Sequence, residues 1–256
     1  MPLTRNLKSI LWVLCLTGLL LGVPRLAGLF ADLFDYSTID PDGAFAWISV
    51  HHIVQAIIFL IPMILISKLS AVRFGFGWGD RSVGWSYVRL FALIFAGYTV
   101  VSLIIVFASG TFQSLPFPLT ARNIVGQLGF QLLLSGPSEE LIFRAFAITM
   151  LALSVYGVVF GKDTGVGRAV FTVLGGELSV ANLIAAVIFG LAHVRFTFAP
   201  FSASYSSFQV IYAVVLGLFY GVCFERSKSM IYPMMMHSIS NVVAVSVSVV
   251  AGFILG

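Results

Sequence analysis

Charged residues are scarce in this chain. Only 9% of its 256 residues are charged, 14 Lys and Arg against 10 Asp and Glu, whereas soluble globular proteins carry about a quarter. So few charges could not cover the water-facing surface of a protein of this size, which excludes an ordinary soluble domain. The net charge of +4 is also small. In a membrane protein it reflects loop topology and contact with anionic lipid, and it does not indicate nucleic acid as a partner.

Cysteine is nearly absent as well. Cys15 and Cys223 lie in apolar runs about two hundred residues apart, without the spacing of metal ligands or of a disulfide framework. We interpret both as packing residues. The apolar run from Ile10 to Val23 follows Arg5 and Lys8 as a signal peptide would, but no convincing small-residue cleavage site comes after it. We therefore expect an uncleaved first span.

Apolar residues, by contrast, make up 59% of the chain, and the mean hydropathy is +1.05. A spanning helix needs about 20 apolar residues, so a chain of this length accommodates roughly seven or eight spans joined by short loops. The sequence predicts an all-α polytopic transmembrane bundle, with an amino-terminal three-span region at 1–122 and a membrane core at 123–256. The apolar runs cover Ile10–Phe30, Phe45–Ile66, Val88–Ala108, Ile124–Phe160, Leu178–Ala192, Phe208–Phe224 and Met230–Leu255.

The fourth run is too long for one straight span. Ser135-Gly136-Pro137 interrupts it, which predicts a discontinuous helix that begins again at about Ser138. If the run crosses once, the bias of Lys and Arg toward cytoplasmic loops favours seven spans with the amino terminus inside. Two crossings would give eight spans and are the alternative.

Ionisable side chains at the depth of the hydrocarbon cost roughly 2.5 to 3.5 kcal/mol each, so each needs a reason. The first cluster is Glu139-Glu140-Leu141-Ile142-Phe143-Arg144. Glu140 and Arg144 are four residues apart on one helical face, where the two side chains can pair. Glu139 points elsewhere and has no local partner. Taken alone, the segment could still be an ion pair that only fixes the helix.

Two further segments carry polar groups near the ends of later spans. His193 closes Phe189-Gly190-Leu191-Ala192-His193, and a lone histidine there is more often structural. His237 and Asn241 are four residues apart and project from one helical face toward a common spot. Such a pair can polarise a carbonyl, or it can simply bond a neighbouring helix.

The adjacent pair His51-His52 lies near the start of the second span. Neighbouring residues on a helix point about 100° apart, so the two rings cannot line one site as readily as His237 and Asn241 can. We expect both to be interfacial.

Together, these groups supply what a peptide hydrolase needs. Glu139 would act as the general base that activates a water molecule, with help from His193, and His237 with Asn241 would hold the developing oxyanion. Glu140 and Arg144 would support the base.

The ordered motifs Glu-Glu-x-x-x-Arg at Glu139, Phe-x-x-x-His at Phe189 and His-x-x-x-Asn at His237 resemble those of the CPBP intramembrane proteases. That family includes type II CAAX prenyl endopeptidases and bacteriocin-processing or immunity proteins, and the resemblance covers roughly 123–250. It implies the same roles for Glu139, Glu140, Arg144, His193, His237 and Asn241. Ala145 stands where family members often have Gly.

This resemblance implies a function. We expect an intramembrane endopeptidase that acts on a membrane-associated protein or peptide. The compact size and short loops favour a bacterial inner membrane. No cofactor is favoured, although zinc is the alternative because glutamate and histidine bind it and the family has been labelled metalloprotease. Competing functions are a proton-coupled transporter and a non-cleaving immunity or scaffold protein.

Overall fold

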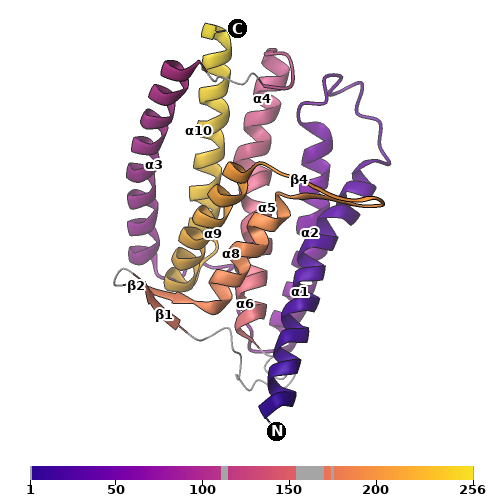
Figure 1. Cartoon of the computed structure of the whole chain (residues 1–256), viewed down its shortest axis with the longest axis vertical. Helices are drawn as coiled ribbons and strands as arrows, with labels where there is room; N and C mark the ends of the chain where they lie inside the picture. Colours follow the sequence, from indigo (N-terminus) through magenta and orange to yellow (C-terminus); the bar gives the residue numbers. More distant parts are fainter. Residues whose placement is uncertain (1, 111–114, 154–169, 174–175, 256) are drawn as a thin grey trace.

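The chain folds as a bundle of long helices (Figure 1), seen in a computed structural model that describes residues 2–110, 115–153, 170–173 and 176–255. Within these described residues, five helices are long and apolar enough to cross a membrane. This confirms an integral membrane protein built as a helical bundle. The five are α1 (Pro2–Ala31), α2 (Ala46–Leu69), α3 (Arg81–Ser109), α9 (Ser207–Ser227) and α10 (Ile231–Leu255).

The predicted break at Gly136-Pro137 is wrong, because the chain stays helical from Ala121 to Ala152. Turns of α-helix alternate there with wider π-helical turns. The segments are α4 (Ala121–Phe130), η1 (Gln131–Ser135), α5 (Gly136–Glu140), η2 (Leu141–Phe146) and α6 (Ala147–Ala152). The rest of the predicted fourth run, 154–160, lies outside the described residues.

A neighbouring helix supplies a hydrogen bond that supports the continuous helix. Pro137 has no N–H, so one carbonyl of the preceding turn loses its helical partner. The π-helical turn before Pro137 rearranges these bonds, and the Ser238 hydroxyl of α10 donates to the Leu132 carbonyl at 2.9 Å. The sequence of the fourth run alone could not reveal a donor that comes from 106 residues further on.

Side-chain caps set where several helices begin. Asp80, Thr120, Ser179 and Ser206 each precede a helix and accept a hydrogen bond from a backbone N–H three residues on. The helix that follows Ser179 is α8 (Val180–Ala192), a shorter apolar helix of 13 residues.

Two short antiparallel hairpins join the helices, and the all-α prediction did not include them. β1 (Val170–Val173) pairs with β2 (Gly176–Ser179), and β3 (Arg195–Phe198) pairs with β4 (Phe201–Ser204). In the second hairpin Arg195 lies opposite Ser204 and Phe198 lies opposite Phe201. Four-residue strands carry too few residues for a period of two to stand out in an apolar sequence.

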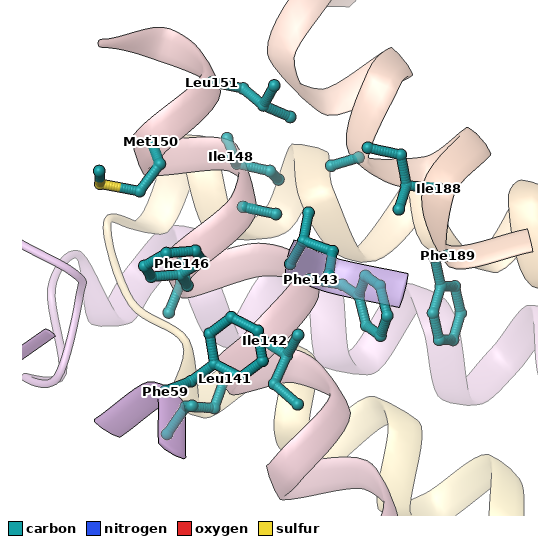
Figure 2. Close-up of a cluster of buried hydrophobic side chains, with 14 of the residues drawn as sticks. Phe59, Leu141, Ile142, Phe143, Phe146, Ile148, Met150, Leu151, Ile188 and Phe189 are labelled. Atoms are coloured by element: carbon teal, nitrogen blue, oxygen red, sulfur yellow. The ribbon is translucent and has the colours of Figure 1, made fainter. Parts of the chain in front are cut away.

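The largest buried cluster surrounds η2 and fixes its position in the middle of the bundle. Figure 2 shows Phe59 of α2 and Phe189 of α8 on either side of the Leu141–Phe146 segment. Phe59 meets Phe146 with ring centroids 4.9 Å apart, and Phe143 meets Phe189 at 5.0 Å. These contacts hold both glutamates, which come directly before this segment, inside the bundle.

The outside of the bundle is apolar. Leu93 of α3, Leu29 of α1 and Phe208 of α9 are each more than 60% exposed. Lipid is the solvent that such a surface requires. The termini lie at opposite ends of the molecule (Figure 1). The seven-span topology and its orientation stay predictions.

Candidate active site

A glycine brings α5 against α10 at the centre of the site. A Cβ atom at Gly136 would lie 2.8 Å from Ser238 Oγ and 2.9 Å from the Ser238 backbone nitrogen. No side chain fits in that space without moving one of the helices. The close approach places the first turn of α5, with both glutamates, beside His237.

The predicted pair of Glu140 and Arg144 is confirmed. Arg144 Nε lies 2.9 Å from Glu140 Oε2, and the two side chains are 1% and 0% exposed. The guanidinium also lies over the Phe189 ring, 4.4 Å from its centroid, and 5.6 Å from that of Tyr220. Both aromatic faces attract the cation, so Arg144 is held by one carboxylate and two rings.

His237 links the two glutamates. Its Nδ1 atom is hydrogen-bonded to Glu140 Oε1 at 2.8 Å, and its Nε2 atom lies 3.7 Å from Glu139 Oε2. The ring also stacks on Tyr220, with centroids 5.4 Å apart. Because Glu140 is held by Arg144, it fixes the orientation of the imidazole and directs Nε2 at Glu139. Glu139, at 19% exposed, is the more accessible carboxylate.

Asn241 and His193 lie further from the carboxylates. The Asn241 amide, one turn after His237, donates to Ser135 Oγ at 3.1 Å. His193 follows the last turn of α8, and its Nδ1 atom lies 2.9 Å from the Phe189 carbonyl oxygen. The Phe189 ring contacts both imidazoles, at 4.9 Å from His193 and 6.1 Å from His237. Among the residues described, His193 makes no hydrogen bond or ion pair with Glu139.

His52 belongs to the site, and the prediction that it is interfacial is wrong. The side chain is only 6% exposed, and its Nε2 atom lies 4.0 Å from Glu139 Oε1. Its Nδ1 atom lies 2.7 Å from Ser138 Oγ and 3.0 Å from Gln55 Nε2. The angle of about 100° between adjacent helical residues does not indicate which of the two rings faces the site. The sequence did carry a signal for this role, because two polar residues, His52 and Gln55, lie one turn apart in an apolar span.

Outside the membrane-spanning segments, one carboxylate organises the connection between α1 and α2. The Asp40 carboxylate accepts hydrogen bonds from the backbone nitrogens of Ala44, Phe45 and Ala46 at 2.6 to 2.8 Å. Burial by itself raises the pKa of Asp40, but these donors together with Arg122 hold it below its ordinary value of 3.8. Nearby Asp42 pairs with Arg122 and accepts from Asn123, which joins this connection to α4.

Comparison with known proteins gives one result. Residues 121–243 match the family model described as type II CAAX prenyl endopeptidase, Rce1-like. This region belongs to the CAAX protease family. The predicted resemblance is thereby confirmed, and the matched region contains all six site residues that the motifs nominated. No curated protein and no solved structure matches the chain.

Membership of the CAAX protease family supports an intramembrane protease, and so a hydrolase, in general terms. It does not favour the transporter or the scaffold. His52 and Gln55 lie on α2, outside the matched region. The centre described above is therefore made from both the family region and the amino-terminal helix α2.

The side chains do not fit a zinc site of the usual kind, which needs about three protein ligands around one ion. Among the described residues, no group of three or more His, Cys, Asp and Glu side chains is placed to hold a metal ion. Metal independence stays a prediction, which a chelation experiment tests.

Proposed function

We propose that this protein is an intramembrane endopeptidase that hydrolyses a peptide bond of a membrane-associated protein or peptide. One observation carries the proposal. The partly exposed carboxylate of Glu139 lies beside the imidazole of His237, and Glu140 and Arg144 anchor that imidazole inside an apolar bundle. A free carboxylate next to a fixed imidazole is an arrangement suited to acid–base work.

Glu139 is the proposed general base. Its separation of 3.7 Å from His237 Nε2 is too long for a direct hydrogen bond, and a water molecule beside the two atoms can contact both. Glu139 takes one proton from this water as the oxygen forms a bond to the peptide carbonyl carbon. The carbonyl π electrons move to the carbonyl oxygen, which becomes an oxyanion.

His237 and Asn241 are the proposed donors to that oxyanion. Donation from Nε2 requires a proton there in addition to the one that Nδ1 shares with Glu140. With that proton, the imidazolium and Arg144 balance the charges of Glu139 and Glu140. The Asn241 amide has two N–H bonds, and Ser135 accepts from it. Each donor contributes about 10² to 10³ in rate in comparable oxyanion sites.

The second half of the reaction returns the proton. The oxyanion collapses, the carbon–nitrogen bond breaks, and the leaving amine takes the proton that Glu139 holds. His193 is the proposed partner of Glu139 on the side of α8, where it would contact the substrate or the water once a substrate is bound. The contact between His193 Nδ1 and the Phe189 carbonyl oxygen sets the orientation of the ring.

The decisive experiment substitutes the base. Glu139→Gln keeps the shape of the side chain and removes its basicity, so we expect cleavage of membrane peptides by the purified protein to fall by about 10² or more. Glu177→Gln is the matched control, because Glu177 is an exposed glutamate on β2, well after Glu139 in the sequence. Mass spectrometry of membranes from cells that express the parent or Glu139→Gln would identify the substrate. Retained cleavage in Glu139→Gln would refute this assignment.

The two other function classes give different results in the same experiment. A transporter would move protons or a substrate in vesicles without cleaving peptides, and an immunity or scaffold protein would bind a peptide and leave it intact. Comparison of a prenylated peptide with its unprenylated counterpart would show which substrate class the protein prefers. We place the protein in a bacterial inner membrane with a cytoplasmic amino terminus, which protease accessibility of a terminal tag can test.

A further inference from the structure

His52 stands out among the buried polar groups that the family motifs leave unexplained. It comes from α2, more than 80 residues before Ser138, yet it lies against the first turn of α5. His52, Gln55 and Ser138 are all 6% exposed or less. Three buried polar side chains that bond one another in an apolar bundle require a reason.

The short contacts at Nδ1 of His52 favour one tautomer of its ring. Gln55 Nε2 can only donate, and with the amide oriented as in the structure it lies 3.0 Å from His52 Nδ1. The Nδ1 atom then accepts, and the Ser138 hydroxyl, which lies 2.7 Å from Nδ1 and 3.2 Å from the Ser135 carbonyl oxygen, donates to the nearer of these two acceptors. The neutral ring therefore carries its proton on Nε2, the atom that faces Glu139 Oε1 at 4.0 Å.

The two oxygens of Glu139 thus have different neighbours. Oε1 faces the N–H of His52, and Oε2 faces His237. A separation of 4.0 Å exceeds a direct hydrogen bond, so the His52 N–H acts through its dipole and through any water that joins the two atoms. In a low-dielectric interior such a dipole is worth more than in water.

We propose that His52 is a positioning residue, whose Nε2 proton holds Oε1 of Glu139 and so leaves Oε2 to take the proton from the attacking water. This role rests on the proposed function of Glu139. It also makes α2 part of the active site, although α2 lies outside the region that matches the family. A merely structural role is the competing explanation, since the contact with Ser138 Oγ also joins α2 to α5.

Two conservative substitutions separate these roles. The amide of Asn occupies the position of a histidine Nδ1 atom, and the longer Gln reaches the position of Nε2. His52→Asn therefore keeps the contact with Ser138 and loses the donor to Glu139, whereas His52→Gln does the reverse. His51→Gln is the control, because it changes the same residue type one position away.

The experiment measures kcat and KM for a peptide that the parent cleaves, with thermal unfolding of each variant. We expect His52→Gln to keep kcat within about threefold of the parent, and His52→Asn to lose about tenfold or more in kcat with little change in KM. Low activity in His52→Gln with parental activity in His52→Asn would show that the residue only joins the helices. Parental activity in both would also overturn the proposal.

A second measurement does not depend on cleavage. The infrared bands of the Glu139 carboxylate can be isolated as the difference between the parent and Glu139→Gln. We expect these bands to shift in His52→Asn and to stay in place in His52→Gln. If the parent cleaves no peptide, the function proposed for Glu139 fails, and the infrared shift alone then shows whether His52 acts on Glu139. Unshifted bands in His52→Asn would refute the contact.

Discussion

The imidazole of His237 is hydrogen-bonded to Glu140 at 2.8 Å, and that carboxylate is fully buried. Glu140 therefore serves two groups at once, since Arg144 lies 2.9 Å from its other oxygen. The two adjacent glutamates therefore have different roles. The buried one orients the site, and the more exposed Glu139 is left to meet water and substrate.

A first prediction concerns this buried carboxylate. Glu140→Gln should lower the free energy of unfolding by about 3 to 5 kcal/mol, because it leaves the Arg144 charge buried without a counterion. The double variant Glu140→Gln/Arg144→Met removes both charges and should recover most of that loss. It should still cleave peptide at least about tenfold more slowly than the parent, because no carboxylate orients His237. Thermal unfolding and a peptide assay measure the two effects, and a stable double variant with parental activity would make the pair purely structural.

A second prediction concerns the contact between α5 and α10. Gly136→Ala should reduce both thermal stability and cleavage, because the new methyl group would meet Ser238 at 2.8 Å and push Glu139 away from His237. Overpacking of this kind costs about 1 to 3 kcal/mol.

Gly129→Ala is the matched control on the same long helical segment. A Cβ atom there meets nothing within 4 Å, so the higher helix propensity of alanine should leave stability unchanged or raise it by up to about 1 kcal/mol. Equal behaviour of the two variants would mean that the close approach at Gly136 does not matter.

The sequence predicted the helices and the relationships within the site between residues of the same helix. Apolar runs located the long helices, and the spacing of four residues predicted the pairing of Glu140 with Arg144 and the shared face of His237 and Asn241. Those inferences succeeded because helical geometry alone relates the residues. The family motifs predicted which segments would meet.

What the sequence could not predict depends on contacts between distant segments. His52 faces Glu139 only because of the register of α2 against α5, which no local pattern encodes. The continuous helix through Pro137 depends on a hydroxyl from α10. In both cases a rule about one helix gave a reasonable expectation, and a side chain from another helix changed the outcome.

A third prediction concerns metal ions. Cleavage should persist after exhaustive treatment with a chelator, because the proposed mechanism uses the side chains of Glu139, His237 and Asn241 alone. The measurement is the peptide assay before chelation, after it, and after zinc is added back, with residual metal determined by mass spectrometry. Complete loss of activity that zinc restores would overturn the glutamate mechanism in favour of a metalloprotease.

A fourth prediction concerns Asp40 and pH. Because the pKa of Asp40 is lowered in the folded protein, its contribution to stability is fully present above its ordinary value of 3.8 and is lost as the pH falls through the lower, folded value. Asp40→Asn should therefore destabilise the protein at neutral pH, by about 1 to 2 kcal/mol, because the three backbone N–H groups before and at the start of α2 lose a charged acceptor. The difference from the parent should shrink in strongly acidic solution. Asp35→Asn is the control, since its exposed carboxylate bonds the nearby Ser37 and not the start of α2. Thermal unfolding in detergent across pH 3 to 7 measures both, and a difference that stays constant down to the acidic limit would show that the Asp40 carboxylate does not hold the start of α2 by its charge.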